Sequence, residues 1–527
     1  MGTAIELLGV SVRVADEIVA LRDITLAVES GELVAIVGAS GTGKTTLLNT
    51  MSGMRVPTAG QVRSVCGTVG YVPQDDIVHL TLPLERSLQY TAALRGVNGD
   101  SVESAISVLE LEDRAAVPIG RLSGGQRKRA SIAAELLAGP DAFFLDEPTS
   151  GLDPARGAEL MRSLRGLAGG GATIVLTTHN PHDAERCDKV AVLAEGGRLA
   201  FFGTPEQARA HFGVATLADV YELLTEAPRP AFSPRASVNS RDVVPPGGFR
   251  QWLLLARRDA DILRRDRLTL AILVGSPLMV LAMFLVLFEP NAFDPAQPNP
   301  EAMVMIVFWL AFGGFFFGLT YGLLQICTEI GVLRRERFTG LKAAPYVLAK
   351  VTILLPVLAG VDFVFLVVLR ALGRLPASGD YGSVFVTLLL SSAAALGFGL
   401  MISVAVAAPA QATIALPMVC FPQVLFVGAI LPVPAMAEVG RWISYAMTNR
   451  WAFEALGHSL GVTSLWASGA SPLGPPLLAS YGETFSRPVA ADWLILAGFS
   501  VSFLAATAVI VARRAPARPK PLAVQPG

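Results

Sequence analysis

Nine consecutive residues combine glycines, hydroxyl groups and one lysine, and the first eight fit the spacing G-x-x-x-x-G-K-[ST]. They are Gly38, Ala39, Ser40, Gly41, Thr42, Gly43, Lys44, Thr45 and Thr46. Glycines let backbone N–H groups turn toward phosphate oxygens, and a helix N-terminus adds partial positive charge. We predict that Lys44 reaches the β- and γ-phosphates of a nucleotide and that Thr45 holds Mg²⁺. The alternative is a glycine-rich turn with a chance lysine.

Two adjacent carboxylates, Asp146 and Glu147, directly follow the apolar run at residues 142–145. We predict that Asp146 binds Mg²⁺ and that Glu147 polarises an attacking water as a general base. A pair that caps a helix is the alternative. Pro148 and the upstream phosphate-binding pattern argue against it.

Two further polar residues follow apolar runs. Gln74 comes after residues 69–72 and Pro73, and its amide can ligate Mg²⁺ or orient a water without titrating. His179 ends the run at 173–178 and can contact a γ-phosphate. A solvated loop glutamine and an unremarkable histidine at a strand end are the alternatives.

A second candidate anion site is the start of a helix predicted at residues 130–138. The residues before it are Ser123, Gly124, Gly125 and Gln126. Ser123 is a natural N-cap, and the free N–H groups of a helix start attract anions. One fold cannot easily direct two such sites at one γ-phosphate, whereas two copies facing each other can. An ordinary capped helix start is the alternative.

Short apolar runs precede these polar residues and predict the buried strands that position them. The runs are 33–37, 69–72, 142–145 and 173–178. Residues 5–29 alternate apolar and polar segments, which predicts strands leading into the glycine-rich loop. Val12, Arg13 and Val14 offer no aromatic ring for a base, so phosphate contacts are expected to dominate nucleotide binding. The first half of the chain is therefore predicted to be an α/β domain with a phosphate loop.

The composition divides the chain in two. Of its 527 residues 52% are hydrophobic and only 16% are charged, against about 25% in soluble proteins. The formal net charge of −1 argues against a nucleic-acid partner. The 4 cysteines have no paired spacing, which argues against a zinc site or a disulfide framework. The N-terminus lacks a basic segment followed by an apolar run, so we expect no cleaved signal peptide and a cytoplasmic first domain.

The second half predicts an all-α membrane domain at residues 250–527, after a disordered Pro/Ser-rich linker at 226–249. An amphipathic surface helix is predicted at 250–267. Six stretches are long enough to cross a bilayer: 268–288, 303–326, 351–369, 384–408, 414–431 and 493–512. Clustered Arg and Lys residues precede the first span, follow the second and follow the sixth. They place both termini in the cytoplasm.

The motifs described above resemble, in order and spacing, those of an ABC-type ATPase. They lie at residues 38–46, 74, 123–126, 146–147 and 179. The resemblance covers residues 1–225. It implies that two copies dimerise head to tail and enclose each ATP, with its Mg²⁺, between the phosphate loop of one copy and Ser123 and Gly125 of the other. Glu147, Gln74 and His179 are the catalytic residues that it implies, and Thr45, Gln74 and Asp146 are the metal ligands.

An ATPase placed before six spans resembles the G subfamily of ABC half-transporters, in a prokaryotic form. Residues 335–340 and 346–350 look like that family's inner coupling segment, and 440–458 look like its re-entrant or interfacial outer region. The resemblance implies an apolar exit plug, for which Ala429 and Ile430 match best.

The implied function is ATP-driven export of a lipid-like or amphipathic compound across a bacterial plasma membrane by a homodimer. A heterodimer is also open. The alternative function is a membrane-anchored ATPase with a mechanical or signalling output to a partner. Asp362, inside the third predicted span, is expected either to contact substrate or to be neutral or paired within the helix bundle. The sequence does not identify the substrate.

Overall fold

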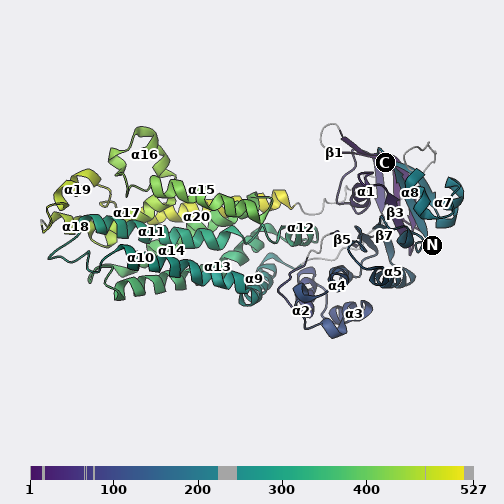
Figure 1. The fold of residues 1–527 in the computed structure, drawn as a ribbon, viewed down its shortest axis with the longest axis horizontal. Helices are drawn as coiled ribbons and strands as arrows, with labels where there is room; N and C mark the ends of the chain where they lie inside the picture. The colour runs from purple at the N-terminus through teal and green to yellow at the C-terminus, as the bar shows by residue number, and fades with distance from the viewer. Residues whose placement is uncertain are drawn as a thin grey trace. The chain divides into compact units, whose positions relative to one another are not determined.

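The chain contains two compact units, whose elements are labelled in Figure 1. The computed structural model describes residues 2–14, 18–64, 66, 68–74, 78–223, 246–468 and 470–515. The N-terminal unit is built from strands and helices up to residue 223, and the second unit, which begins at Gly248, is helical. The linker predicted at 226–249 lies outside the described residues up to residue 245.

A six-stranded sheet with the order β5-β6-β7-β3-β8-β9 organises the N-terminal unit. All neighbouring strands are parallel except β8 and β9. The strands are β3 (Leu33–Gly38), β5 (Val69–Val72), β6 (Ala142–Leu145), β7 (Thr173–Thr177), β8 (Lys189–Ala194) and β9 (Arg198–Gly203). Because parallel strands end at the same edge of a sheet, the loops after β3, β5, β6 and β7 meet there.

A three-stranded antiparallel sheet with the order β2-β1-β4 accompanies it. Its strands are β1 (Thr3–Val14), β2 (Ile18–Glu29) and β4 (Ala59–Ser64). The helices of this unit are α1 (Lys44–Met51), α2 (Leu84–Arg95), α3 (Asp100–Val108), α4 (Gly124–Leu136), α5 (Pro154–Gly169), α6 (Pro181–Ala184), α7 (Pro205–Phe212) and α8 (Leu217–Leu223). The four apolar runs predicted as strands are β3, β5, β6 and β7, and all four are lined by buried hydrophobic side chains.

Among the described residues of the second unit, five helices are long and apolar enough to cross a membrane. They are α10 (Arg267–Leu287), α11 (Pro300–Leu323), α13 (Ala343–Ala371), α14 (Tyr381–Ala405) and α20 (Val489–Arg514). The stretch predicted at 414–431 differs, because α15 (Pro409–Leu425) has 17 residues and contains Pro417 and Pro422. Each internal proline removes a helical hydrogen bond. The helix ends before Leu431.

Shorter helices lie at the two ends of these long ones within the unit (Figure 1). The helix α9 (Gly248–Arg265) accounts for the surface helix predicted at 250–267, and α12 (Ile330–Phe338) belongs to the inner loop. The region predicted at 440–458 consists of α16 (Glu438–Tyr445), which is mostly exposed, and α17 (Thr448–Ser459), which is mostly buried. The remaining helices are α18 (Val462–Ala467) and α19 (Gly474–Tyr481).

The helices α11 and α14 approach each other backbone to backbone. A Cβ atom at Gly318 of α11 would lie 2.1 Å from the carbonyl oxygen of Ser392 in α14. Only glycine fits at this position, and small residues are the usual means by which membrane helices approach closely. The hydroxyl of Ser403, also in α14, accepts the N–H groups of Ile326 and Cys327 at 2.9 and 3.0 Å. It therefore satisfies backbone groups just beyond the end of α11.

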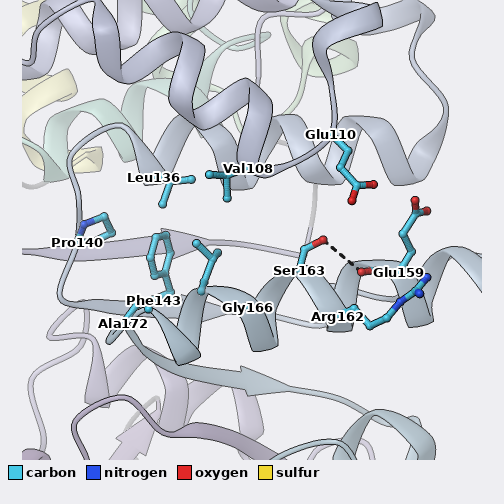
Figure 2. Close-up of a pocket in the computed structure, with 12 residues that line it drawn as sticks. Val108, Glu110, Leu136, Pro140, Phe143, Glu159, Arg162, Ser163, Gly166 and Ala172 are labelled. Carbon is cyan, nitrogen blue, oxygen red and sulfur yellow. Dashed lines mark hydrogen bonds between the residues drawn. The ribbon is translucent and has the colours of Figure 1, made fainter.

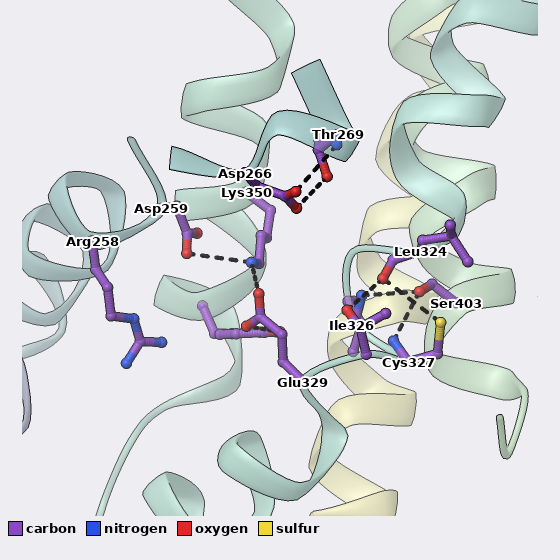
Figure 3. A network of polar contacts seen from close by, with 12 residues as sticks. Arg258, Asp259, Asp266, Thr269, Leu324, Ile326, Cys327, Glu329, Lys350 and Ser403 are labelled. Atoms are coloured by element: carbon purple, nitrogen blue, oxygen red, sulfur yellow. Dashed lines mark hydrogen bonds and ion pairs between the residues drawn. The ribbon is translucent and has the colours of Figure 1, made fainter. Parts of the chain in front are cut away.

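Five charged side chains, four of them buried, connect α9, α13 and the segment from Glu329 through α12. Figure 3 labels four of the five: Arg258, Asp259, Glu329 and Lys350. The ammonium of Lys350 lies 3.3 Å from a carboxylate oxygen of Asp259 and 2.6 Å from one of Glu329. Arg258 pairs with Glu336 in the same region. Lys350 and Arg258 belong to the basic clusters beside the predicted spans, and they are only 3% and 1% exposed. Burial of an ion pair costs several kcal/mol per ion, so these charges depend on their partners.

Asp362 of α13 is fully buried within the bundle of one chain. The hydroxyl of Ser392 lies 2.8 Å from its Oδ2 atom and 3.0 Å from the carbonyl oxygen of Gly314. One hydroxyl hydrogen cannot fully serve two acceptors. If Asp362 is protonated, its own O–H can be donated to the Ser392 oxygen, and the Ser392 hydrogen then serves the Gly314 carbonyl oxygen. The arrangement favours a neutral acid that connects α13, α14 and α11.

Replacement of Lys350 by Met tests the buried charges. Loss of the ammonium leaves the carboxylates of Asp259 and Glu329 buried without it, and we expect a loss of about 3–5 kcal/mol in stability. The matched control is Lys342→Met, because Lys342 is exposed just before the same helix. Thermal unfolding of the purified proteins in detergent measures both. Equal melting temperatures for the two variants would contradict the proposed dependence on Lys350.

Replacement of Asp362 by Asn tests its protonation state. The neutral amide keeps an N–H donor toward Ser392, so we expect the same melting temperature as wild type between pH 6 and 8. Asp362→Ala removes the connection and should cost about 0.5–2 kcal/mol. If Asp362→Asn is instead as unstable as Asp362→Ala, a neutral acid at this position is ruled out.

Candidate active site

The glycine-rich loop joins β3 to α1, with Gly38 at the end of the strand and Lys44 at the start of the helix. Gly43 has φ +96°, and a Cβ atom there would lie 2.5 Å from the carbonyl oxygen of Ala20. Glycine is therefore required. The Lys44 ammonium donates to the carbonyl oxygens of Gly38 and Ala39 at 2.8 and 2.9 Å. Burial lowers the pKa of Lys44, and the nearby carboxylates of Glu147 and Asp146 oppose this shift. The loop thus holds its cation close to its own backbone.

A hydroxyl and a carboxylate meet at the end of β6. The Thr45 hydroxyl lies 3.1 Å from the Oδ1 atom of Asp146. Both groups offer hard oxygen atoms of the kind that Mg²⁺ prefers, and they come from the two segments predicted to hold this ion. These side chains therefore fit a magnesium site.

Glu147 brings together the three residues predicted to be catalytic. Its Oε2 atom lies 3.2 Å from the Gln74 amide nitrogen and 3.2 Å from the Nδ1 atom of His179. The backbone of Glu147 has φ +44°, a left-handed conformation that is rare outside glycine. Residues held in such conformations cluster at functional sites. The His179 side chain is 62% exposed, so its outer edge is accessible.

The segment Ser123 to Gln126 lies at the start of α4, apart from this cluster. The Ser123 hydroxyl accepts the Gln126 N–H at 3.4 Å, and the Gln126 side chain accepts the Ser123 N–H at 3.1 Å. This reciprocal capping box starts the helix at Gly124, so the start predicted at residue 130 was wrong. Ser123, Gly125 and Gln126 line a hollow of about 70 Å³. No hydrogen bond between described residues joins this segment to the glycine-rich loop.

Three residues that sequence reasoning missed support the cluster. Thr177, at the end of β7, contacts Asp146 and Glu147. Asp183 accepts from the hydroxyls of Thr149 and Thr178 at 2.6 and 3.1 Å, which ties the loop after Glu147 to the strand end that precedes His179. Lys128 of α4 donates to the Gln74 carbonyl oxygen at 2.8 Å. In the sequence, the only feature that could have pointed to any of these residues was the polar pair Thr177–Thr178 at the end of an apolar run.

A cleft in the N-terminal unit lies elsewhere (Figure 2). It encloses about 580 Å³ between the ends of α3 and α4, β6 and α5, with Leu136 and Phe143 among its apolar side chains and Glu159 at its charged end. None of the residues predicted to bind nucleotide lines it. The candidate site lies instead at the edge of the sheet where β3, β5, β6 and β7 end.

Comparisons with known proteins agree with this division of the chain. Residues 21–150 match the family model described as ABC transporter, and residues 250–460 match the model described as ABC-2 type transporter. The ABC transporter ATP-binding/permease protein Rv1747 of Mycobacterium tuberculosis is 31% identical over 477 residues, which are 82% of this chain and 55% of that protein. The chain thus spans about half the length of this relative.

Other relatives match a shorter part of the chain. ABC transporter G family member 21 of Arabidopsis thaliana is 37% identical over 216 residues, 37% of this chain and 32% of that protein. The Nod factor export ATP-binding protein I of Burkholderia lata is 33% identical over 213 residues, 37% of this chain and 69% of that protein. The chain therefore belongs to the ABC transporters, with an N-terminal ABC ATPase domain followed by an ABC-2 type membrane domain in a G-family-like arrangement.

Proposed function

We propose that this protein hydrolyses ATP and uses the energy to export a lipid-like or amphipathic compound. The observation that supports hydrolysis best is the position of Glu147, one residue after Asp146 and 3.2 Å from both Gln74 and His179. A carboxylate placed there can take a proton from an attacking water. Gln74 and His179 restrict its orientation and can contact the water and the γ-phosphate.

The glycine-rich loop binds the phosphates of ATP in this proposal. Its backbone N–H groups and the α1 N-terminus supply partial positive charge, and Lys44 supplies a full one. Thr45 and Asp146, with Gln74, would hold Mg²⁺, which neutralises charge on the β- and γ-phosphates when bound. Lys44 then exchanges its bonds to Gly38 and Ala39 for bonds to phosphate oxygens.

A second copy of the chain completes each ATP site. Ser123 and Gly125 offer a capped helix start, yet among the described residues Ser123 bonds to its own helix turn and both line a small hollow. The same groups from a partner can cover the γ-phosphate bound at the sheet edge. Dimerisation on ATP binding is how the ATPase would drive the membrane helices.

Six crossings are proposed for the membrane domain, with α15 as the fifth in chain order. Its 17 residues extend about 26 Å, close to the thickness of a bilayer core of about 30 Å. An even number of crossings places the basic ends before α10 and after α20 on one side, with the ATPase in the cytoplasm. Helices of one chain and its partner would then enclose the exported compound.

Reconstituted vesicles test export. The protein is placed in liposomes that contain a fluorescent phospholipid, ATP is added on the side of the ATPase, and the leaflet distribution of the dye is followed by quenching. We expect a redistribution that requires ATP and is absent with Lys44→Ala. ATP hydrolysis without any redistribution, for this lipid and a panel of fluorescent amphipaths, would instead favour a mechanical or signalling output.

Lys44→Ala removes the only full positive charge of the loop. We expect ATP turnover to fall at least about 100-fold, because the charge on the β- and γ-phosphates is no longer offset. The control is Arg198→Ala, an exposed cation on β9. Steady-state phosphate release from purified protein measures both variants. If Lys44→Ala hydrolyses ATP at the wild-type rate, the assignment of the phosphate loop is wrong.

Glu147→Gln keeps the shape of the side chain and removes its basicity. We expect ATP binding to persist while turnover falls about 100-fold or more. Binding of a fluorescent ATP analogue and phosphate release report the two effects separately. Glu195→Gln, at an exposed position of the same domain, controls for loss of a carboxylate. A Glu147→Gln protein that hydrolyses ATP normally would show that another group is the base.

A further inference from the structure

We infer that Thr177 is a positioning residue, which sets the orientation of Asp146 and Glu147 for ATP hydrolysis. This inference rests on the proposed ATPase function and adds a residue from a neighbouring strand to it. Thr177 is the last residue of β7, and its side chain is fully buried. Among the described residues its side chain makes no hydrogen bond to residues 38–46, and it bonds instead to Asp146 and Glu147.

The Thr177 hydroxyl makes two bonds of opposite direction. It donates to the Oδ1 atom of Asp146 at 2.6 Å and accepts the backbone N–H of Glu147 at 2.9 Å. A hydroxyl has one hydrogen to donate and lone pairs to accept, so both bonds form together. One side chain therefore holds the carboxylate of one residue and the backbone of the next.

The bond to the Glu147 N–H acts where the backbone is strained. The left-handed conformation of Glu147 is unfavourable for a residue with a side chain and persists only where its surroundings enforce it. The hydroxyl of Thr177 accepts the N–H at this turn. Relaxation of the turn would swing the Glu147 carboxylate away from Gln74 and His179.

The bond to Asp146 fixes the rotation of its carboxylate. Thr177 and Thr45 approach the same oxygen, Oδ1, at 2.6 and 3.1 Å. Among the described residues neither hydroxyl bonds to Oδ2, so the other oxygen keeps its acceptor sites. Groups that act in catalysis need such supporting hydrogen bonds to remain within tenths of an ångström of the productive geometry.

Two substitutions separate the effect of the Thr177 hydroxyl from the effect of the side-chain shape. Valine has nearly the shape of threonine without the hydroxyl, and serine has the hydroxyl without the methyl group. If the inference holds, Thr177→Val lowers kcat about 10- to 100-fold, whereas KM for ATP changes less than about twofold because the phosphate loop is intact. Thr177→Ser retains kcat within about threefold of wild type.

The experiment measures kcat, KM and binding of a fluorescent ATP analogue on the full chain in lipid nanodiscs. The matched control is Thr173→Val, a buried position of the same strand whose hydroxyl accepts the Gly31 N–H at 3.2 Å, away from the site. It should keep wild-type kcat. Thr177→Ala is the second hydroxyl-free variant, for use if Thr177→Val does not fold.

A double-mutant cycle tests whether Thr177 acts through Glu147. In the Glu147→Gln background, Thr177→Val should lower the residual rate by much less than its effect of about 10- to 100-fold in the wild type, since the Glu147 base is already disabled and only the bond to Asp146 remains to be lost. A full additional loss would overturn the inference. So would wild-type kcat in a folded Thr177→Val protein, or a Thr177→Ser protein as slow as Thr177→Val.

These outcomes are separable from failure of the proposed function. If the wild type hydrolyses ATP and Glu147→Gln does not, the ATPase assignment holds whatever Thr177→Val does. If the wild type shows no ATP hydrolysis that depends on Lys44, the proposed function fails before Thr177 is considered.

Discussion

The parallel order of β5, β6, β7 and β3 is the constraint on which the candidate active site depends. Thr45 and Asp146 are separated by 101 positions in the sequence, yet their side chains lie 3.1 Å apart. They meet because both follow parallel strands that end at one edge of the sheet. Gln74 and His179 reach the same edge from the loops after β5 and β7, and Glu147 lies beside Asp146 in the loop after β6. A strand reversed within this set would carry its polar residue to the opposite edge.

Within the ATPase domain, the sequence predicted those site residues that lie in loops directly after apolar runs. Apolar runs predicted β3, β5, β6 and β7, and the polar residues after them lie together as a result. Thr177 was missed because a threonine inside an apolar run looks like any β-branched strand residue. The early start of α4 was missed because two glycines disfavour a helix, while the capping box of Ser123 and Gln126 outweighs that preference.

In the membrane domain, hydropathy predicted six spans, because a spanning segment must be apolar over most of its length. Five of the six correspond to long apolar helices among the described residues. Hydropathy did not predict which charges are buried. Arg258 and Lys350 look like basic residues at a membrane boundary. The acidic partner of Arg258, Glu336, lies 78 residues away in the sequence. The two partners of Lys350, Asp259 and Glu329, lie 91 and 21 residues away. Periodicity within one helix contains no information about such partners. The helix α15 ends earlier than the predicted span because it contains prolines, and how far a proline disrupts a helix depends on the surrounding packing.

The contact between α11 and α14 has a mechanical consequence. No side chain lies between Gly318 and the Ser392 backbone. At this point, therefore, no side chain can change its rotamer to let one helix slide past the other. The pair should translate and tilt as one rigid body. Any bending of the membrane domain would then be confined to helices that touch through longer side chains, among them α13 and α20. A rigid pair of this kind can transmit a displacement along its whole length without absorbing it.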